Sequence, residues 1–254
     1  MSEGIQIRGV THRIHGAQIL QPIDLSVPAG KMTALIGPNG AGKSTLVRLI
    51  ARIDPLQNGD IHVGGLDVAA TPSARLALEL AFMGQHSGLV SRLRVRELVA
   101  FGRWPHCQGR PGPADHAAVG QALTDFDLMP LADRFMDELS GGQAQRAHLA
   151  MTVAQQTPWV LLDEPLNNLD LAHARALMVH LARLRDQGRS VLVVLHDLNF
   201  ASGWADHVVS MKAGQVVAQG TPAEVLTEPR LSALYDTPIT VGSYQDRPLI
   251  LHHM

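Results

Sequence analysis

The sequence predicts an α/β fold with a mostly parallel sheet, and three short apolar segments are the basis of this prediction. They are residues 31–36, 159–165 and 190–195, and each one leads into glycines, acids or a histidine. Short apolar runs of this kind are typical of parallel strands that are covered on both faces. Ligands bind beyond the carboxyl ends of such strands, so the residues that follow each run are candidate site residues.

The first apolar segment leads into a complete G-x-x-x-x-G-K-[ST] phosphate loop, and Leu46–Ile50 continues the chain as a helix. Glycines let backbone N–H groups point at phosphates, and the helix dipole adds to their field. Lys43 is expected to reach the β- and γ-phosphates, and the Ser44 hydroxyl to bind Mg²⁺. A chance match in an ordinary strand–helix turn is the alternative, which this context disfavours. The predicted nucleotide-binding residues are Gly37, Pro38, Asn39, Gly40, Ala41, Gly42, Lys43, Ser44 and Thr45.

The second apolar segment ends in two acids, Asp163 and Glu164. Successive side chains on a strand diverge, so the two carboxylates can take different tasks. We expect Asp163 to hold Mg²⁺, directly or through water, and Glu164 to act as the general base on an attacking water. A strand that ends in a solvated acidic turn is the alternative, and it becomes the weaker one beside a phosphate loop.

A second glycine turn, Leu139-Ser140-Gly141-Gly142-Gln143, precedes the acidic strand and opens a predicted helix. Its backbone donors suit another phosphate. Because the phosphate loop already holds the nucleotide in cis, this second nest makes most sense if it closes on the nucleotide of a partner subunit. The alternative is a structural turn in which Ser140 is the N-cap of the helix.

The third apolar segment delivers His196 at its end. An imidazole at this position can hydrogen-bond a γ-phosphate and the attacking water. A single histidine at a strand end is more often structural, but the surrounding predicted site favours the functional interpretation.

The remaining sequence predicts a helical insertion within the core. Residues 5–36 alternate short apolar strands with polar turns, and 60–65 indicates a short strand and turn. Helical periodicity at Arg96–Gly102 and Ala117–Asp127 flanks a Pro- and Gly-rich loop, Trp104–Pro113.

Core strands resume at Val160, and residues 207–212 and 215–219 are predicted to form a hairpin around Ala213-Gly214. We therefore predict one domain over residues 1–254, with a core of 1–86 and 156–254 and an inserted helical subdomain of 87–155.

Composition agrees with a single globular α/β chain. The 254 residues are 46% apolar, and the net charge of −2 argues against a general electrostatic attraction to nucleic acid. No apolar run is long enough to span a bilayer, and residues 1–4 lack the features of a signal peptide. The single Cys107 suits a reducing compartment, and the thirteen scattered histidines do not indicate a metal site.

The motifs occur in the order found in ATP-binding-cassette (ABC) ATPases, which this chain resembles over essentially its whole length. The order is the phosphate loop, Gln85, Leu139–Gln143, Val160–Pro165, Leu166–Asp170 and His196. The Leu-Ser-Gly-Gly-Gln segment is highly specific to that family. The chain is also similar to the ATPase subunits of bacterial iron–siderophore importers, a group that includes haem and cobalamin importers. This closer likeness lies in 98–105, 163–170, 196–202 and 219–226.

The resemblance implies a role for each matched position. Gln85 matches the glutamine that touches Mg²⁺ and water and carries the transmembrane signal, Glu164 the catalytic carboxylate, and His196 the switch histidine. Asp170 matches the aspartate that links the two sites. The part that clasps ATP across a head-to-tail dimer corresponds to Ser140, Gly141, Gly142 and Gln143. P-loop NTPase architecture is implied as well, with an N-terminal antiparallel β subdomain and an inserted helical subdomain.

The resemblance also implies partners and a location. ATP and Mg²⁺ are the expected cofactors, and a second copy of the chain and integral membrane permease subunits are the direct partners. A periplasmic or surface substrate-binding protein is an indirect partner, and the chain is expected at the cytoplasmic face of the bacterial inner membrane. Haem or cobalamin import, an exporter subunit and a soluble cassette acting on ribosomes or DNA are the alternatives.

The sequence does not decide which residue contacts adenine or which segment contacts the permease. The family usually stacks adenine on an aromatic residue, but the corresponding stretch, Val10–Gly16, contains none; Ile14 or a flanking histidine, His12 or His15, takes that place. For the permease contact, His86–Arg96 is one candidate, with Leu89, Val90 and Leu93 among three arginines, and a solvated basic helix start is the equal alternative. The loop Trp104–Pro113 is a further candidate.

Overall fold

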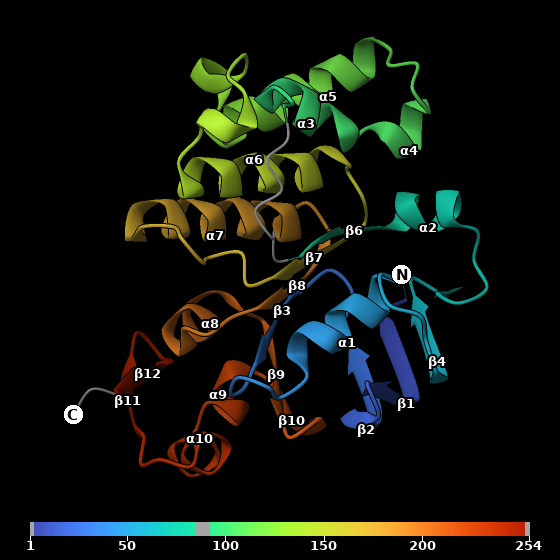
Figure 1. The fold of residues 1–254 in the computed structure, drawn as a ribbon. Helices are drawn as coiled ribbons and strands as arrows, with labels where there is room; N and C mark the ends of the chain where they lie inside the picture. Colours follow the sequence, from blue (N-terminus) through green and yellow to red (C-terminus); the bar gives the residue numbers. More distant parts are fainter. Residues whose placement is uncertain (1–2, 85–91, 252–254) are drawn as a thin grey trace.

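A six-stranded sheet runs through the centre of the molecule in the computed structural model, which describes residues 3–84 and 92–251 (Figure 1). Five strands are parallel, and the edge strand β10 runs antiparallel to β9. In order across the sheet the strands are β10 (Gln215–Gly220), β9 (His207–Lys212), β3 (Met32–Ile36), β8 (Ser190–Val194), β7 (Trp159–Asp163) and β6 (Leu80–Met83).

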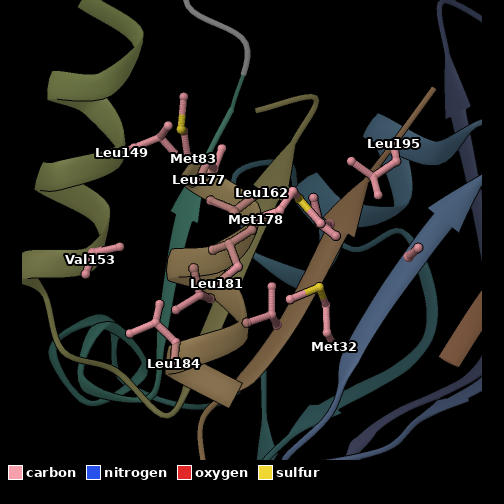
Figure 2. Packing of buried hydrophobic residues seen from close by; sticks show 14 of the residues in the cluster. Met32, Met83, Leu149, Val153, Leu162, Leu177, Met178, Leu181, Leu184 and Leu195 are labelled. Atoms are coloured by element: carbon pink, nitrogen blue, oxygen red, sulfur yellow. The ribbon is translucent and has the colours of Figure 1, made fainter. Parts of the chain in front are cut away.

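Side chains alternate between two apolar clusters, one on each face of this sheet. On β7, Val160 and Leu162 belong to one cluster, whereas Trp159 and Leu161 belong to the other. Figure 2 shows the first cluster, in which α7 (Leu171–Asp186) lays its apolar stripe against the strands. Helix α1 (Lys43–Ile50) packs into the second cluster. Burial on both faces explains why these strands are continuously apolar.

An antiparallel sheet lies beyond α1 and covers the second cluster (Figure 1). Its strands are β2 (Ala17–Val27), β1 (Ile5–Ile14), β4 (Asn58–Val63) and β5 (Leu66–Asp67), in that order. The predicted short strands of 5–36 are three strands, the long β1 and β2 and the short β3 of the central sheet. A tight turn joins β1 to β2, in which His15 and Gly16 both adopt positive φ angles. Helix α2 (Ser73–Glu79) leads from this sheet into β6.

The helical lobe, green to yellow-green in Figure 1, lies beside α7 on the side away from the sheet. Its elements are α3 (Val95–Phe101), α4 (Trp104–Cys107), α5 (Pro113–Asp125), η1 (Met129–Leu131), η2 (Met136–Glu138) and α6 (Gly141–Ala154). Two local expectations need correction here. The loop Trp104–Pro113 contains the single helical turn α4, and α5 begins at Pro113 rather than Ala117, because proline fits the first turn of a helix.

The C-terminal part returns to the core. Helix α8 (Leu198–Trp204) follows β8, and the predicted hairpin of β9 and β10 turns at Ala213 and Gly214, which both have positive φ. The chain then forms α9 (Pro222–Val225), α10 (Glu228–Tyr235), β11 (Thr240–Tyr244) and β12 (Arg247–Leu251). Within the described residues, every helix is too short or too polar to span a lipid bilayer.

Candidate nucleotide site

The phosphate loop connects the end of β3 to the start of α1 and owes its shape to glycines. Gly37, Gly40 and Gly42 have φ angles of 144°, 78° and 96°. Close packing adds a second reason, because a Cβ on Gly42 would lie 2.5 Å from Leu20 Cδ2 and one on Gly37 would collide with the Met211 carbonyl. Only glycine therefore fits this tight turn.

Lys43 is the first residue of α1 and is 5% exposed. Its ammonium donates to the carbonyl oxygens of Gly37, at 2.7 Å, and Pro38, at 3.0 Å. Burial lowers the Lys43 pKa, and the nearby charges of Glu164 and Asp163 oppose that shift. The ammonium thus sits inside the loop, where the phosphate oxygens of a nucleotide would offer it stronger acceptors than two carbonyls.

Asp163 ends β7 and meets the phosphate loop through Ser44, whose hydroxyl donates to Oδ1 at 2.9 Å. The carboxylate is 3% exposed; burial raises its pKa, and the Ser44 hydrogen bond partly offsets this. Carboxylate and hydroxyl oxygens are the ligands that Mg²⁺ takes, together with substrate phosphates. No cluster of three or more His, Cys, Asp or Glu residues suited to a metal occurs in the described chain. The pair therefore fits a cation that shares its ligands with a nucleotide.

Glu164 is held by a histidine from the neighbouring strand. Strands β7 and β8 are paired with Asp163 beside Val194, so the residues that follow them emerge together. Glu164 has a φ of 54°, and its Oε1 lies 2.6 Å from His196 Nε2. Asn167 Nδ2 donates to the other oxygen at 2.7 Å. A left-handed backbone in a non-glycine residue is a form of strain that clusters at functional sites.

These two contacts set the charge of Glu164. Burial alone would raise its pKa, but the hydrogen bonds from His196 and Asn167 outweigh burial, and the net pKa lies below the ordinary value. Glu164 is therefore ionised at neutral pH and fixed in orientation, as a base that positions water must be.

The second glycine turn opens α6, and within this chain Ser140 is its N-cap. Gln143 N–H donates to Ser140 Oγ at 3.3 Å, and Ser140 N–H donates to Gln143 Oε1 at 3.0 Å, which completes a capping box. Gly142 lies close to the Asn168 carbonyl, 3.2 Å from where a Cβ would be. Across the described residues, no hydrogen bond or ion pair joins 140–143 to the phosphate loop.

Comparison with known proteins identifies the class of this site. A family model described as ABC transporter matches residues 20–167. The chain belongs to the ABC transporter family.

Several curated relatives of this ABC protein match nearly end to end. The petrobactin import ATP-binding protein YclP of Bacillus subtilis is 39% identical over 96% of this chain and 97% of its own. The petrobactin import ATP-binding protein FatE of Bacillus anthracis is 44% identical over 87% of this chain and 88% of its own. The hemin import ATP-binding protein HmuV of Streptomyces coelicolor is 40% identical over 90% of this chain and 82% of its own. The chain is accordingly an ATP-binding ATPase of this family.

Solved structures show the same fold. An inward-facing ABC transporter described as of the metal-chelate type superposes with a TM-score of 0.83 and 25% identity, over 99% of this chain and 97% of that one. A dimeric bacterial ABC transporter cassette gives a TM-score of 0.77 at 24% identity, over 85% and 98%. Both confirm the α/β cassette fold expected from the sequence.

Asp170 and Gln85, two further residues that the sequence predicts to be in the site, have different outcomes. Asp170 is the N-cap of α7 and accepts hydrogen bonds from His173 N and Nδ1, both at 2.8 Å. Gln85 lies outside the described residues, as do Leu89 and Val90. The proposed role of Gln85 therefore stays a prediction.

The adenine candidates differ in accessibility. His12 is 5% exposed on β1, with its Nδ1 buried and without a partner in the described chain. Ile14 is 41% exposed, and His15 occupies the exposed turn before β2. A base cannot stack on a side chain that the protein already covers, so Ile14 and His15 are the accessible candidates.

Two contributors to the site escaped the sequence reasoning. Asn167 was noticed only as part of the family motif, although an amide three residues after Glu164 is suitably spaced to return to it. Tyr235, at the end of α10, lies near the backbone of Gly37; burial raises the pKa of Tyr235 to about 12, and the Gly37 backbone opposes that rise. No sequence signal indicated that the last helix supports the phosphate loop.

Proposed function

We propose that this chain is the ATP-hydrolysing subunit that powers import of an iron–siderophore complex across the bacterial inner membrane. It acts at the cytoplasmic face as a head-to-tail dimer with two MgATP at the interface. The observation that carries the ATPase part is the single cluster formed by the phosphate loop, Asp163, Glu164 and His196. The substrate class is supported by the relatives, which include petrobactin, hydroxamate and enterobactin transport proteins.

Each side chain has a distinct task in the proposed reaction. Lys43 leaves the Gly37 and Pro38 carbonyls and binds the β- and γ-phosphates. Glu164 accepts a proton from the attacking water, and His196 hydrogen-bonds that water and the γ-phosphate. Ser44 and Asp163 would hold Mg²⁺, which neutralises charge on the phosphates when it is bound. Gln85 is proposed to complete that set.

Dimerisation supplies the second half of each site in this proposal. Residues 140–143 are exposed or half-buried, and in the described part of the chain no hydrogen bond joins them to the phosphate loop. The N–H groups of Ser140 and Gln143 are used in the capping box, so those of Gly141 and Gly142 are the ones available to a γ-phosphate held by the partner. Asp170 caps α7 beside this turn and is proposed to link the two sites. The γ-phosphate is present only before hydrolysis, and its differential binding therefore closes and releases the dimer.

The helical lobe offers the proposed permease surface. Phe101, Trp104 and Met129 are 49%, 57% and 53% exposed around a mostly apolar hollow of about 620 Å³. Large exposed apolar side chains gathered in one place mark interaction sites. Leu93 and Arg96, from the predicted segment 86–96, also line this hollow. Arg96 is paired with Asp133 at 2.8 Å, and Arg94 stacks on Phe135 at 4.8 Å. We therefore propose that the permease contacts this chain at this hollow.

Haem import is the second candidate substrate, since the hemin import relative is as similar as several siderophore relatives. The ATPase site does not touch the transported chelate, so it cannot separate the two. A substrate-binding protein would select the chelate outside the membrane and is proposed as an indirect partner.

Three substitutions test the ATPase model. Glu164→Gln should retain MgATP binding, stop phosphate release and trap a closed dimer. Lys43→Ala should weaken nucleotide binding in the monomer, whereas Ser140→Arg should spare that binding and block ATP-dependent dimerisation. Ser243→Arg, on exposed β11, is the matched control. Equilibrium binding and analytical ultracentrifugation measure these outcomes; substantial turnover by Glu164→Gln would remove the base assignment.

The substrate is tested with the chain and its permease reconstituted in vesicles. ATP-dependent uptake of ferric siderophores is compared with uptake of haemin, with the substrate-binding protein added outside. Uptake of haemin alone would overturn the siderophore assignment and leave the ATPase assignment intact.

A further inference from the structure

A second cavity lies far from the phosphate loop in the chain, where the helical lobe meets α7. It has a volume of about 310 Å³ and is lined by α5, the C-terminal end of α6, the C-terminal half of α7 and the residues after it. In Figure 1 these three helices are stacked in that order above the sheet. Val153 and Leu184, both labelled in Figure 2, line it on its apolar side. None of the candidate nucleotide-site residues contributes to the lining.

Two buried nitrogens beside this cavity have no partner in the described chain. One is His180 Nε2, on a side chain that is 8% exposed, and the other is Arg189 Nη1. Both residues line the cavity. Buried donors are almost always satisfied in proteins, because an unsatisfied one, above all a charged one, is costly. Two such atoms at the same cavity indicate a ligand that forms hydrogen bonds, and the Arg189 guanidinium, which can only donate, requires that this ligand carry acceptors.

The charged side chains that line the cavity indicate that the ligand is an anion. Arg183 and Arg189 both line the cavity, and neither forms an ion pair with any acid in the described part of the chain. Burial lowers the Arg189 pKa. Asp125 is the one lining acid, and its Oδ1 already accepts from the Gln121 amide at 2.9 Å.

Arg185, near the end of α7, differs from Arg183 and Arg189 because it has acidic partners. Arg185 pairs with Asp186 at 2.9 Å and with Asp206 at 3.4 Å. Asp186 and Asp206 thus pair with Arg185, whereas Arg183, an exposed residue of α7, and Arg189, which follows the helix, line the cavity and form no ion pair in the described chain. Three amide side chains, those of Gln121, Gln156 and Gln187, complete a lining that can donate from several directions.

We propose that this cavity binds a small, multiply charged oxyanion of the phosphate or polycarboxylate class. Arg189 and Arg183 supply the countercharge, and His180 and the glutamine amides complete the hydrogen bonds. Because α5 belongs to the helical lobe and α7 packs on the core sheet, the anion would join the two and stiffen the boundary between them.

The direct test is isothermal titration calorimetry with inorganic phosphate and, separately, with citrate. The phosphate loop is first filled with a non-hydrolysable ATP analogue, so that it does not bind the probe. Arg189→Met and Arg183→Met remove the proposed countercharge, and Arg175→Met is the matched control, because Arg175 is exposed on the same helix and does not line the cavity. Circular dichroism checks that each variant is folded.

Saturable binding by the parent and by Arg175→Met, weakened about tenfold or more in Arg183→Met and Arg189→Met, is the expected result. The stronger of the two probes identifies the source of the oxyanion. Equal binding by all four proteins, or no binding of either probe by the parent, overturns the proposal. Because the nucleotide site stays filled throughout, neither outcome bears on the ATPase assignment.

Discussion

Asn167 offers the most searching test of how the general base is held. Its amide donates to Glu164 Oε2 at 2.7 Å, and Asn167→Ala removes that contact without touching the phosphate loop. A hydrogen bond to a charged group contributes about 1.5–3 kcal/mol when it is shielded from water. Asn167 is exposed, so water can replace much of the loss, and about 1 kcal/mol is a reasonable remainder. This predicts a roughly fivefold lower kcat.

Asn167→Ala should also change how kcat depends on pH, in a direction that follows from the Glu164 pKa. Glu164 must be ionised to act as a base, and the hydrogen bonds from His196 and Asn167 are what lower its pKa against the effect of burial. Without Asn167 the Glu164 pKa rises, so fewer molecules carry the ionised base at acidic pH. The acid limb of the kcat profile should therefore move to higher pH, while KM for ATP stays close to that of the parent.

Steady-state phosphate release between about pH 5 and pH 8 measures both effects. Asn58→Ala is the control, since Asn58 is also exposed and its amide donates to the neutral Thr11 hydroxyl at 3.1 Å. An unchanged kcat together with an unmoved acid limb in Asn167→Ala would show that Asn167 does not orient Glu164.

Three further predictions concern the loop, the core and the base. Gly42→Ala should lower stability by about 1–3 kcal/mol in urea unfolding and weaken ATP binding, because it combines a φ of 96° with a steric clash; Gly188→Ala, at φ 86° in open space, should cost less and spare binding. Leu162→Ala should lower the unfolding free energy by about 2–5 kcal/mol, whereas the half-exposed Val217→Ala should change it by less than about 0.5 kcal/mol. Ile14→Tyr should tighten ATP binding by about fivefold or more in equilibrium titrations, since base stacking contributes about 1–3 kcal/mol; an unchanged affinity for ATP would place adenine elsewhere.

The sequence was sufficient to predict the strands that carry the site. Residues 159–163 and 190–194 are buried on both faces, so their apolar runs left no ambiguity of period, and the phosphate loop is shaped by glycines that local sterics require. The residues that follow these strands were therefore predicted at the correct edge of the sheet.

Contacts between distant segments were beyond such reasoning. The 2.6 Å approach of His196 to Glu164 depends on β7 and β8 being neighbours, which follows from the topology and not from either segment alone. The left-handed backbone at Glu164 and the burial of His12 are likewise tertiary effects, in which packing overrides what the local pattern indicates. Tyr235 reaches Gly37 across almost two hundred residues of chain.

The contact between Gly142 and the Asn168 carbonyl has a consequence for the proposed dimer. Gln145, one turn further along α6, also donates to the Pro165 carbonyl at 3.1 Å. The segment just after Glu164 therefore packs against the helix whose N-terminus is proposed to contact the other subunit. A movement of that segment when one nucleotide is cleaved would therefore displace the start of α6, which is the surface proposed to bind the other nucleotide. In the proposed dimer, these contacts would couple the state of one nucleotide site to the surface that clasps the nucleotide of the other subunit.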